Sequence, residues 1–538
     1  MASKKHIERI EAALGAGDIQ RALKMCDARL RSRPGDSAIK LLQGRALLAA
    51  GEFQAVVDSL AALTVQSTAS ADAFLMHAFA LVQMERTEAA FDLVKSGLTA
   101  HPAHGELLQY AGLLTDQLTQ PVESEAYFRK LTALEPERGD AHLGLGNALQ
   151  RQGRDDEALG SYKAAAAVDP GNPAPLVNVA NLLGKQNDHP GAQAAYQGIL
   201  KSFPERRDVS ANLGASLVLS RDYEAAVAAF DAYLQAFPDD FEASLSRAKA
   251  MLKGGDAAES ARALAGMMTR FPDNPKVCPE LINACLSMGE PTAAISYLDA
   301  YLKRFPKSAD AYSSVPILHA ALHPGNSEDG VAALEAEIKA YDLTLPPHYA
   351  DTPAFFDAVC AAVYAHPSLM DAPPEHATRA GLHTGDLAKV PVAPAIADLI
   401  SAIKGCVHDY AESDAGRGNR FFDGLDLATA GLNMWAVVMR EGGYQEPHIH
   451  PTARISGVVY GKVPDSIQEN VARGGNTRAG WIEFGRPHAD FHQPESLPVT
   501  LIQPVLGRIV LFPSYMYHAT VPLNGTEHRI SLAFDIVG

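Results

Sequence analysis

The sequence predicts a multidomain protein in which an all-α solenoid is followed by a β-rich barrel or sandwich. Prolines recur at multiples of 34 along the first 306 residues, which indicates a repeated helix pair. After Pro306 this period stops, and from about residue 376 short β-rich segments are separated by glycine, proline and asparagine. The length of 538 residues also exceeds that of one ordinary domain.

The repeated unit carries small, aromatic and proline positions in a fixed order. A small residue twelve positions before each proline lets two helices approach closely, and a ring eight positions before it fills the gap to the next repeat. The proline ends the second helix, because it has no amide hydrogen to donate. Nine such units fill 306 residues. The prolines are Pro34, Pro102, Pro136, Pro170, Pro204, Pro238, Pro272 and Pro306, Thr68 marks the one gap, and the rings are Phe128, Tyr162, Tyr196 and Phe230.

This pattern resembles the tetratricopeptide repeat (TPR) from about residue 5 to residue 320. The resemblance implies a right-handed TPR solenoid of about nine 34-residue helix pairs, whose concave groove binds a peptide or protein partner. Asn147 and Asn181 lie one repeat apart, as do Asn178 and Asn212. Two interpretations of these asparagines stay open. They grip a peptide backbone, as the asparagine ladder of O-GlcNAc transferase does, or they are ordinary polar positions on a solvated helix.

The composition excludes some partners and predicts a compartment. A net charge of −17 argues against non-specific binding to nucleic acid or to anionic membranes. The first residues, MASKKHIERIEAAL, lack the apolar segment of a signal peptide, and no long uncharged apolar run follows them. We therefore expect a cytoplasmic protein with no membrane partner and with reduced cysteines. The cysteines are scattered without a CxxC motif, at Cys26, Cys278, Cys285, Cys360 and Cys406.

Turn-rich segments mark the predicted domain limits. We expect the solenoid in residues 1–318, a helical connector in 319–375 and the β-rich domain with flanking helices in 376–538. The helices expected beyond the repeats lie in residues 331–341, 354–366 and 394–413. The strands expected in the last domain lie in residues 431–441, 453–463, 479–486, 497–505, 507–514, 518–523 and 528–537.

The stretch YQEPHIHPTARISGVVY contains two histidines one residue apart. Because side chains alternate along a strand, His448 and His450 would share one face, and Glu446 would share it if the strand continued past Pro447. A third imidazole, His518, follows the strand-like segment GRIVLFPS. Two neighbouring ligands and one distant ligand are typical of a mononuclear metal site, which leaves positions open for a cosubstrate and oxygen.

This part of the chain, residues 376–538, resembles the double-stranded β-helix (jelly-roll or cupin-like) domain of the Fe(II)/2-oxoglutarate-dependent oxygenases, and most closely the branch related to prolyl hydroxylases. His448 matches the first histidine of the family's HxD motif, and His518 matches the distant histidine. Arg529, eleven residues after His518, matches the basic residue that pairs with the far carboxylate of 2-oxoglutarate. An arginine suits this role because its planar fork matches a carboxylate. Ser531 completes an Arg-x-Ser pair for the same carboxylate.

The resemblance also implies the cofactors and further site residues. Tyr460 resembles the tyrosine that often touches the cosubstrate, and GWIEF resembles the strand between the two histidine strands. Fe(II), 2-oxoglutarate and O2 are therefore expected. His448, His450 and His518 would bind the metal, and the residues important for catalysis would be these three and Arg529.

The sequence departs from the family at the acidic ligand, because His450 stands where the family has aspartate. Three interpretations remain. His450 is itself a ligand, as in some cupin-fold dioxygenases; or two histidines and water suffice, as in aspartyl/asparaginyl β-hydroxylases; or Glu446 or Glu483 supplies the carboxylate. We favour the first, because both the spacing and the strand face suit His450.

A cupin pattern fits the same histidines. The cupin spacing GxxxxxHxH starts at Gly442, and GxxxxxPxxxxH starts at Gly507. The usual cupin glutamate is replaced near Arg454, however, and the pair Arg529 and Ser531 is not a simple cupin feature. These two differences favour an enzyme that uses 2-oxoglutarate.

The expected function is hydroxylation of a protein or peptide side chain that the TPR groove recruits. The architecture is reminiscent of collagen prolyl hydroxylases and aspartyl β-hydroxylases, so this expectation rests on analogy. Three alternatives stay open: a small-molecule substrate with a separate TPR partner, a TPR interaction scaffold whose oxygenase domain is catalytically silent, and a cupin-like metal domain that does not use 2-oxoglutarate.

Overall fold

The computed structural model describes residues 2–66, 68–372, 376–389, 391–467 and 477–538. Contacts between residues divide the chain into two compact units, Met1–Pro238 and Asp239–Gly538. The predicted limits at residues 318 and 375 stay a prediction.

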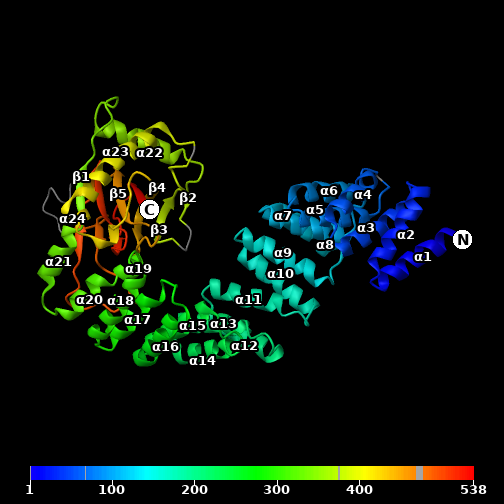
Figure 1. The fold of residues 1–538 in the computed structure, drawn as a ribbon, viewed down its shortest axis with the longest axis horizontal. Coiled ribbons are helices and arrows are strands. Elements are labelled where there is room, and N and C mark those ends of the chain that lie inside the picture. Colours follow the sequence, from blue (N-terminus) through cyan, green and yellow to red (C-terminus); the bar gives the residue numbers. More distant parts are fainter. Residues whose placement is uncertain (1, 67, 373–375, 390, 468–476) are drawn as a thin grey trace. The chain divides into compact units, whose positions relative to one another are not determined.

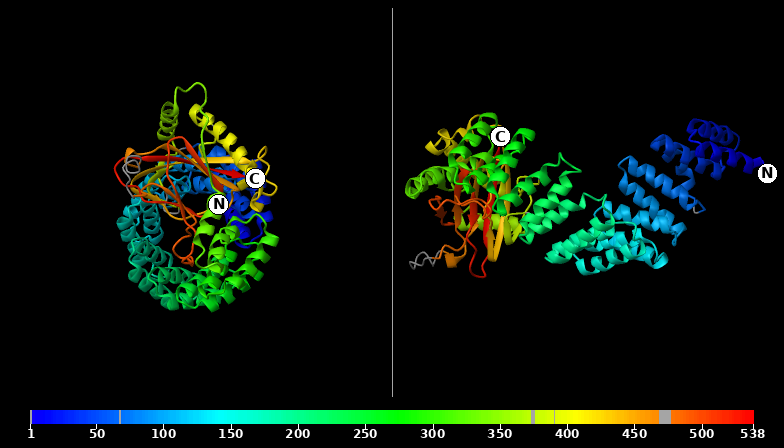
Figure 2. Two further views of the ribbon diagram at one scale, coloured as in Figure 1. Left: turned by 90° about the vertical axis from the view of Figure 1, so that its left-hand side faces the viewer. Right: turned by 90° about the horizontal axis from the view of Figure 1, so that it is seen from below.

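The first unit consists of antiparallel helix pairs that stack one after another (Figures 1 and 2). Its helices are α1 (Ala2–Gly15), α2 (Ile19–Ser32), α3 (Ser37–Ala50), α4 (Phe53–Thr64), α5 (Ala71–Gln83), α6 (Thr87–Ala100), α7 (Gly105–Gln117), α8 (Pro121–Leu134), α9 (Gly139–Arg151), α10 (Asp155–Val168), α11 (Ala174–Lys185), α12 (His189–Ser202), α13 (Val209–Leu219) and α14 (Tyr223–Leu234).

Small residues and rings hold the helix pairs together, as the repeat pattern predicts. An added Cβ at Gly146 would lie 2.5 Å from the ring of Tyr162, and one at Gly144 would lie 2.4 Å from the ring of Phe128. Both distances are too short for any side chain, so glycine is required where the rings fill the space between helices.

The asparagine pairs connect adjacent repeats. Tyr162 Oη and Asn178 Nδ2 both donate hydrogen bonds to Asn147 Oδ1, at 3.0 and 3.3 Å. One repeat further on, Asn181 Oδ1 accepts in the same way from the next tyrosine and from Asn212, at 2.5 and 3.4 Å. These contacts within the solenoid favour the second interpretation, that the asparagines are polar positions of the repeat itself.

The second unit begins with two further helix pairs. They are α15 (Phe241–Lys253), α16 (Ala257–Arg270), α17 (Val277–Ser287) and α18 (Pro291–Arg304). With the first unit they make nine helix pairs in the described part of the chain, so the predicted number of repeats is confirmed. Short helices then lead onward: α19 (Ala309–Tyr312), α20 (Val315–Leu322) and α21 (Ser327–Ala336).

Two antiparallel sheets form the β-rich part of the second unit (Figure 1). The large sheet has the order β1-β8-β5-β10-β4-β3-β2 and the small sheet the order β7-β6-β9. The strands are β1 (Lys339–Asp342), β2 (Met370–Asp371), β3 (Thr378–His383), β4 (Gly431–Gln445), β5 (Ile455–Lys462), β6 (Ile482–Phe484), β7 (Thr500–Ile502), β8 (Arg508–Pro513), β9 (His518–Thr520) and β10 (Arg529–Val537). The predicted fold class, a TPR solenoid followed by a jelly-roll-like domain, is therefore confirmed.

Each of the seven predicted strand segments contains a strand, from β4 to β10. The helices expected at 354–366 and 394–413 are also present, as α22 (Thr352–Tyr364) and α23 (Pro394–Glu412). The helix predicted at 331–341 is partly wrong, because α21 ends at Ala336 and the last residues form β1, which pairs with β8 at the sheet edge.

The two faces of the large sheet have different neighbours. On one face, Phe356 and Cys360 of α22 contact Gly461 of β5, and Cys360 Sγ donates a hydrogen bond to the Gly461 carbonyl at 3.3 Å. Because side chains alternate along a strand, Tyr460 and its cross-strand partner Ser531 of β10 point to the opposite face. That opposite face carries the site described below.

A loop of the β-rich part joins it to the last repeat. Asn283 of α17 is 2% exposed, donates from Nδ2 to the Asp490 carbonyl at 3.1 Å, and accepts from the His492 amide at 2.7 Å. The buried rings of Phe491 and Tyr517 belong to the hydrophobic core of α15–α18. The last two helix pairs are therefore packed into one unit with the β-rich part.

All five cysteines are free thiols, and three of them are buried. Among the described residues, no helix has both the length and the apolar character needed to cross a membrane.

Candidate metal centre

A cavity lies on the inner face of the large sheet. Three cross-strand pairs of β10 and β5 line up there: Ser531 with Tyr460, Ala533 with Val458, and Asp535 with Ser456. The cavity is lined by Trp435, Gln445, His448, His450, Gly457, Val458, Tyr460, Ile482, Phe512, His518, Thr520, Arg529, Ser531 and Ala533.

His448 and His518 are joined through their backbones. The amide of each donates to the carbonyl of the other at 3.1 Å, which forms an isolated antiparallel bridge. Regular strand β4 already ends at Gln445, before Pro447, which has no amide hydrogen. The expectation of a regular strand through the HxH motif is therefore wrong, although the bridge brings the two imidazole centroids within 4.2 Å.

His450 completes the group. Its ring centroid lies 5.2 Å from that of His448 and 5.0 Å from that of His518. One ring nitrogen from each histidine can be chosen so that all three lie within 4.8 Å of one another. The structure thus brings together the three histidines that the sequence predicts as metal ligands.

Hydrogen bonds fix which nitrogen of each ring carries the proton. His448 Nδ1 lies 2.8 Å from the Glu446 carbonyl, and His518 Nδ1 lies 3.0 Å from the Met516 carbonyl. His450 Nδ1 lies 2.6 Å from the Asp535 carboxylate. Since these oxygens accept hydrogen bonds, Nδ1 is the donor in all three rings. The three Nε2 lone pairs remain for a metal ion.

Burial keeps two of the imidazoles neutral. It lowers the pKa of His448 to about 4, helped by the neighbouring charge of His450, and it lowers the pKa of His518 well below its usual value. At neutral pH both rings therefore have an Nε2 lone pair. Three nitrogen donors on one side of a cavity suit a divalent transition metal such as Fe(II).

Arg529 and Tyr460 form a second part of the same cavity. Arg529 is 2% exposed, and no carboxylate of the described residues lies within ion-pair distance of it. Its Nε and the Tyr460 hydroxyl are buried without a hydrogen-bond partner in the described structure. The guanidinium carbon lies 5.7 Å from the Tyr460 ring centroid, and the guanidinium nitrogens donate to the Gly480 carbonyl and to Thr520 Oγ1.

Burial shifts the pKa of both groups. It lowers the pKa of Arg529 from its usual value and raises the pKa of Tyr460 to about 12. The guanidinium nevertheless stays charged at neutral pH, and the phenol stays a donor. A buried cation without an anionic partner is costly, so this end of the cavity suits a carboxylate ligand. The residues present therefore fit 2-oxoglutarate.

The two glutamates considered as alternative ligands lie in other contacts. Glu446 pairs with Arg379 at 2.8 Å, and Glu483 pairs with Arg486 at 2.8 Å. Neither belongs to the group of three histidines.

Two side chains that lie against His450, those of Asp535 and Trp435, were not predicted from the sequence. Asp535 holds His450 Nδ1, and Trp435 of β4 lies beside the same ring with centroids 5.5 Å apart. The alternation that places Arg529 and Ser531 on one face reaches Asp535 two steps further along the strand. That signal could have found Asp535.

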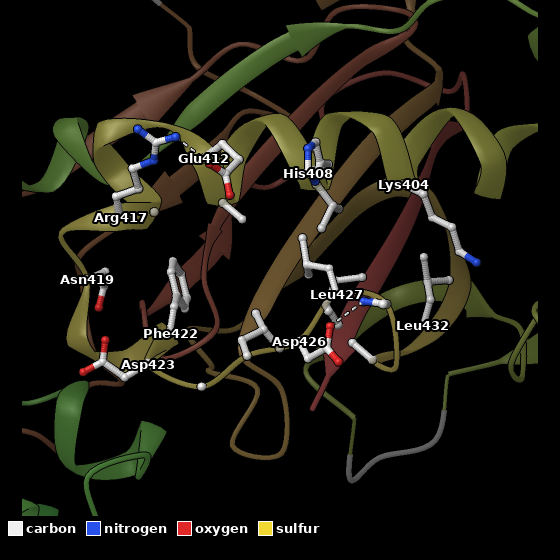
Figure 3. Close-up of a pocket in the computed structure, with 18 residues that line it drawn as sticks. Lys404, His408, Glu412, Arg417, Asn419, Phe422, Asp423, Asp426, Leu427 and Leu432 are labelled. Atoms are coloured by element: carbon white, nitrogen blue, oxygen red, sulfur yellow. Dashed lines mark hydrogen bonds and ion pairs between the residues drawn. The ribbon is translucent and has the colours of Figure 1, made fainter.

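A second, larger hollow shares no lining residue with the histidine cavity (Figure 3). Lys404, His408 and Glu412 follow one side of α23 along it, and Glu412 pairs with Arg417 at 2.6 Å. On the facing loop, the Asp426 carboxylate accepts from the Ala428 amide at 3.0 Å. The charges of this hollow are mixed and partly paired within the protein.

Comparison with known proteins agrees with a chain of helical repeats followed by a β-rich domain. Residues 433–535 match the family model described as Putative 2OG-Fe(II) oxygenase. Tetratricopeptide repeat models match residues 7–71, 117–173, 179–240, 216–275 and 251–315. The chain therefore carries tetratricopeptide repeats followed by a domain of this oxygenase family. A search of the curated proteins gives no match.

Several solved structures are similar to parts of the chain. A tetratricopeptide repeat protein from Parabacteroides merdae is 20% identical over 43% of this chain and 92% of its own, with a TM-score of 0.35. MamA from Desulfovibrio magneticus is 20% identical over 31% of this chain and 93% of its own, with a TM-score of 0.29. YrrB, described as a TPR protein with an unusual peptide-binding site, is 20% identical over 34% and 93%, with a TM-score of 0.31.

Proposed function

We propose that the chain is an Fe(II)/2-oxoglutarate-dependent dioxygenase that hydroxylates a protein or peptide side chain. One observation carries this proposal: three histidines whose Nε2 atoms are available to a metal line the same cavity as a buried arginine that has no acidic partner among the described residues. A metal ion would bind the three histidines, and a dicarboxylate would pair with the arginine.

Each residue has a defined part in this function. His448, His450 and His518 would hold Fe(II), which when bound supplies the activation of O2. Arg529 would bind the far carboxylate of 2-oxoglutarate, with the hydroxyls of Tyr460 and Ser531 as further donors. The apolar walls of the cavity exclude water from the reacting centre and strengthen these polar contacts; they include Val458, Ile482 and Phe512.

The TPR solenoid supports a polypeptide substrate. TPR repeats generally bind peptides or proteins, and a chain that carries both a repeat array and an oxygenase domain can hold a partner near the site that modifies it. We place this reaction in the cytoplasm, where the five thiols stay reduced.

An anaerobic titration tests the proposed function. Fe(II) is added to the protein with 2-oxoglutarate, and a visible metal-to-ligand charge-transfer band is expected, followed by succinate after oxygen is admitted. The same titration without 2-oxoglutarate should give no band. Absence of both the band and succinate would refute the oxygenase assignment.

A second candidate function is a TPR interaction scaffold whose β domain is silent or binds metal without 2-oxoglutarate. The replacement of the family's aspartate by His450 favours it. In that case the protein would retain a partner on the repeats but would form no succinate. Metal binding without the 2-oxoglutarate band would indicate the cupin-like variant.

A further inference from the structure

A buried carboxylate lies directly behind one of the three histidines. Asp535 is 8% exposed, and its Oδ1 lies 2.6 Å from His450 Nδ1 and 2.7 Å from Ser456 Oγ. The partners lie on three segments of the fold: Asp535 on β10, Ser456 opposite it on β5, and His450 in the segment after β4. The register of β10 and β5 therefore fixes the contact between Asp535 and Ser456.

No permanent cation balances this carboxylate. In the part of the chain that the structure describes, His450 is the only basic group within ion-pair distance of Asp535. An unbalanced charge in a protein interior is costly, and neutralising it requires a partner with positive charge. A divalent ion on the far side of the imidazole would be such a partner.

Asp535 is not part of the group of described side chains that could hold the ion. Nδ1 and Nε2 lie on different edges of the imidazole ring, so a group bonded to Nδ1 lies away from an ion bound at Nε2. Asp535 Oδ1 also already accepts from Ser456. The other two histidines differ, because their Nδ1 atoms donate to neutral backbone carbonyls. Only His450 is backed by a negative charge.

We propose that Asp535 is a positioning residue that orients His450 toward the metal and supplies, through the Nδ1–H hydrogen bond, the negative charge that three neutral histidine ligands lack. The carboxylate thus lies one imidazole further from the metal than in an HxD site. This inference rests on the metal-binding part of the proposed function and does not require turnover.

The test is the affinity of the full chain for Co(II), measured without oxygen or 2-oxoglutarate by the visible bands of the bound ion. Asp535→Asn keeps an oxygen that can accept from His450 Nδ1 but removes the charge. We expect it to weaken Co(II) binding by about 10- to 100-fold, as removal of an outer-sphere carboxylate does. Unchanged affinity would overturn the proposal.

A matched control separates this effect from the general loss of a buried acid. Glu337 is a half-buried carboxylate of the same unit, which accepts from Tyr515 Oη at 2.7 Å and does not line the histidine cavity. Glu337→Gln should leave the Co(II) affinity within about twofold of wild type. An equal loss in both variants would contradict a specific role for Asp535.

A second measurement keeps the proposal testable if Asp535→Asn does not fold. In wild-type protein loaded with Zn(II) and labelled with 15N-histidine, the Nδ1–H proton of His450 should resonate downfield of those of His448 and His518, because its bond is short and charge-assisted. A His450 resonance like the other two would overturn the proposal. Co(II) binding without any 2-oxoglutarate band would refute the oxygenase function alone, whereas wild-type protein that binds no metal would refute both.

Discussion

At the scale of single residues, the cavity combines three histidine nitrogen donors with Arg529, a cation that has no carboxylate within ion-pair distance among the described residues. The donors and the cation approach from both sheets, since His518 lies on β9 of the small sheet and Arg529 on β10 of the large one. The three histidines and Arg529 can be tested separately, because metal binding and 2-oxoglutarate binding give different signals.

Arg529→Ala should weaken 2-oxoglutarate binding and abolish succinate formation but should not affect metal binding. Loss of a charge-assisted contact to a carboxylate costs about 3 kcal/mol, which corresponds to roughly a hundredfold weaker binding. The charge-transfer band formed on titration with 2-oxoglutarate measures this change. Arg486→Ala is the matched control, because Arg486 pairs with Glu483 at the surface. Wild-type turnover in Arg529→Ala would remove this arginine from the cosubstrate site.

His450→Ala should remove one of three metal ligands. We expect a loss of Co(II) affinity larger than the about 10- to 100-fold typical of an outer-sphere change. Glu446→Gln and Glu483→Gln should bind Co(II) like wild type, because each glutamate is held by an arginine outside the group of histidines. Retained affinity in His450→Ala would instead support a site with two histidines and water.

The sequence predicted most of this site but not its outer contacts. The histidines and Arg529 stand in short motifs whose spacing can be read directly. Strand alternation places Asp535 on the same face as Arg529 and Ser531, but its contact with His450, 85 residues earlier, depends on tertiary packing that the alternation does not show. Trp435 was missed for the same reason, because its position beside His450 depends on the packing of β4.

At the scale of elements, the helix pairs depend on contacts between rings and glycines. In α9, Gly144 has no room for a methyl group against Phe128, whereas Gly160 of α10 has nothing within 4 Å of an added Cβ. The two glycines therefore predict opposite effects of the same substitution.

Gly144→Ala should destabilise the pairs around α9, by about 1 to 3 kcal/mol, because the Phe128 ring must move. Gly160→Ala is the control and should stabilise α10 by up to about 1 kcal/mol, because alanine favours an exposed helix position. Hydrogen exchange of peptides from α8 to α10 in the full chain measures both. Slower exchange in Gly144→Ala would contradict the close contact.

Elements were predictable where a period or an alternation extends over many residues. The 34-residue period located the helix pairs, and β4 and β10 are long enough to show alternation. The sequence favours a helix through the end of segment 331–341, because the apolar pattern of α21 continues through Ile338 and Tyr341. In the structure, Tyr341 pairs with Ile509 at the edge of the large sheet, so the end of this segment forms a strand instead of a helix.

At the scale of the whole molecule, the second compact unit contains both catalytic candidates and repeats. Asn283 holds the 488–492 loop by two backbone hydrogen bonds, and Lys253 adds an ion pair with Asp490 at 2.7 Å. The sequence could not show this, because the contacting residues are separated by about 200 positions.

Asn283→Ala should loosen the 488–492 loop, because it leaves the Asp490 carbonyl and the His492 amide without their partner. The expected cost is roughly 2 to 3 kcal/mol, seen as faster hydrogen exchange in residues 486–492. Lys253→Ala removes only a partly exposed ion pair and should cost less than about 1 kcal/mol. Equal effects of the two variants would contradict the dominant role of Asn283.

The hydrogen bonds between Asn283 of α17 and the 488–492 loop have a consequence for how such a chain can evolve. Asn283 stands at the same repeat position as Asn147, four periods of 34 residues later, but its side chain contacts the 488–492 loop of the β-rich part. Asn283 and the 488–492 loop both belong to the second unit, so duplication or loss among the repeats before Pro238 would change the length of the array without removing either partner of this contact. Recombination among homologous genes should therefore preserve the last two helix pairs together with the β domain as one inherited segment.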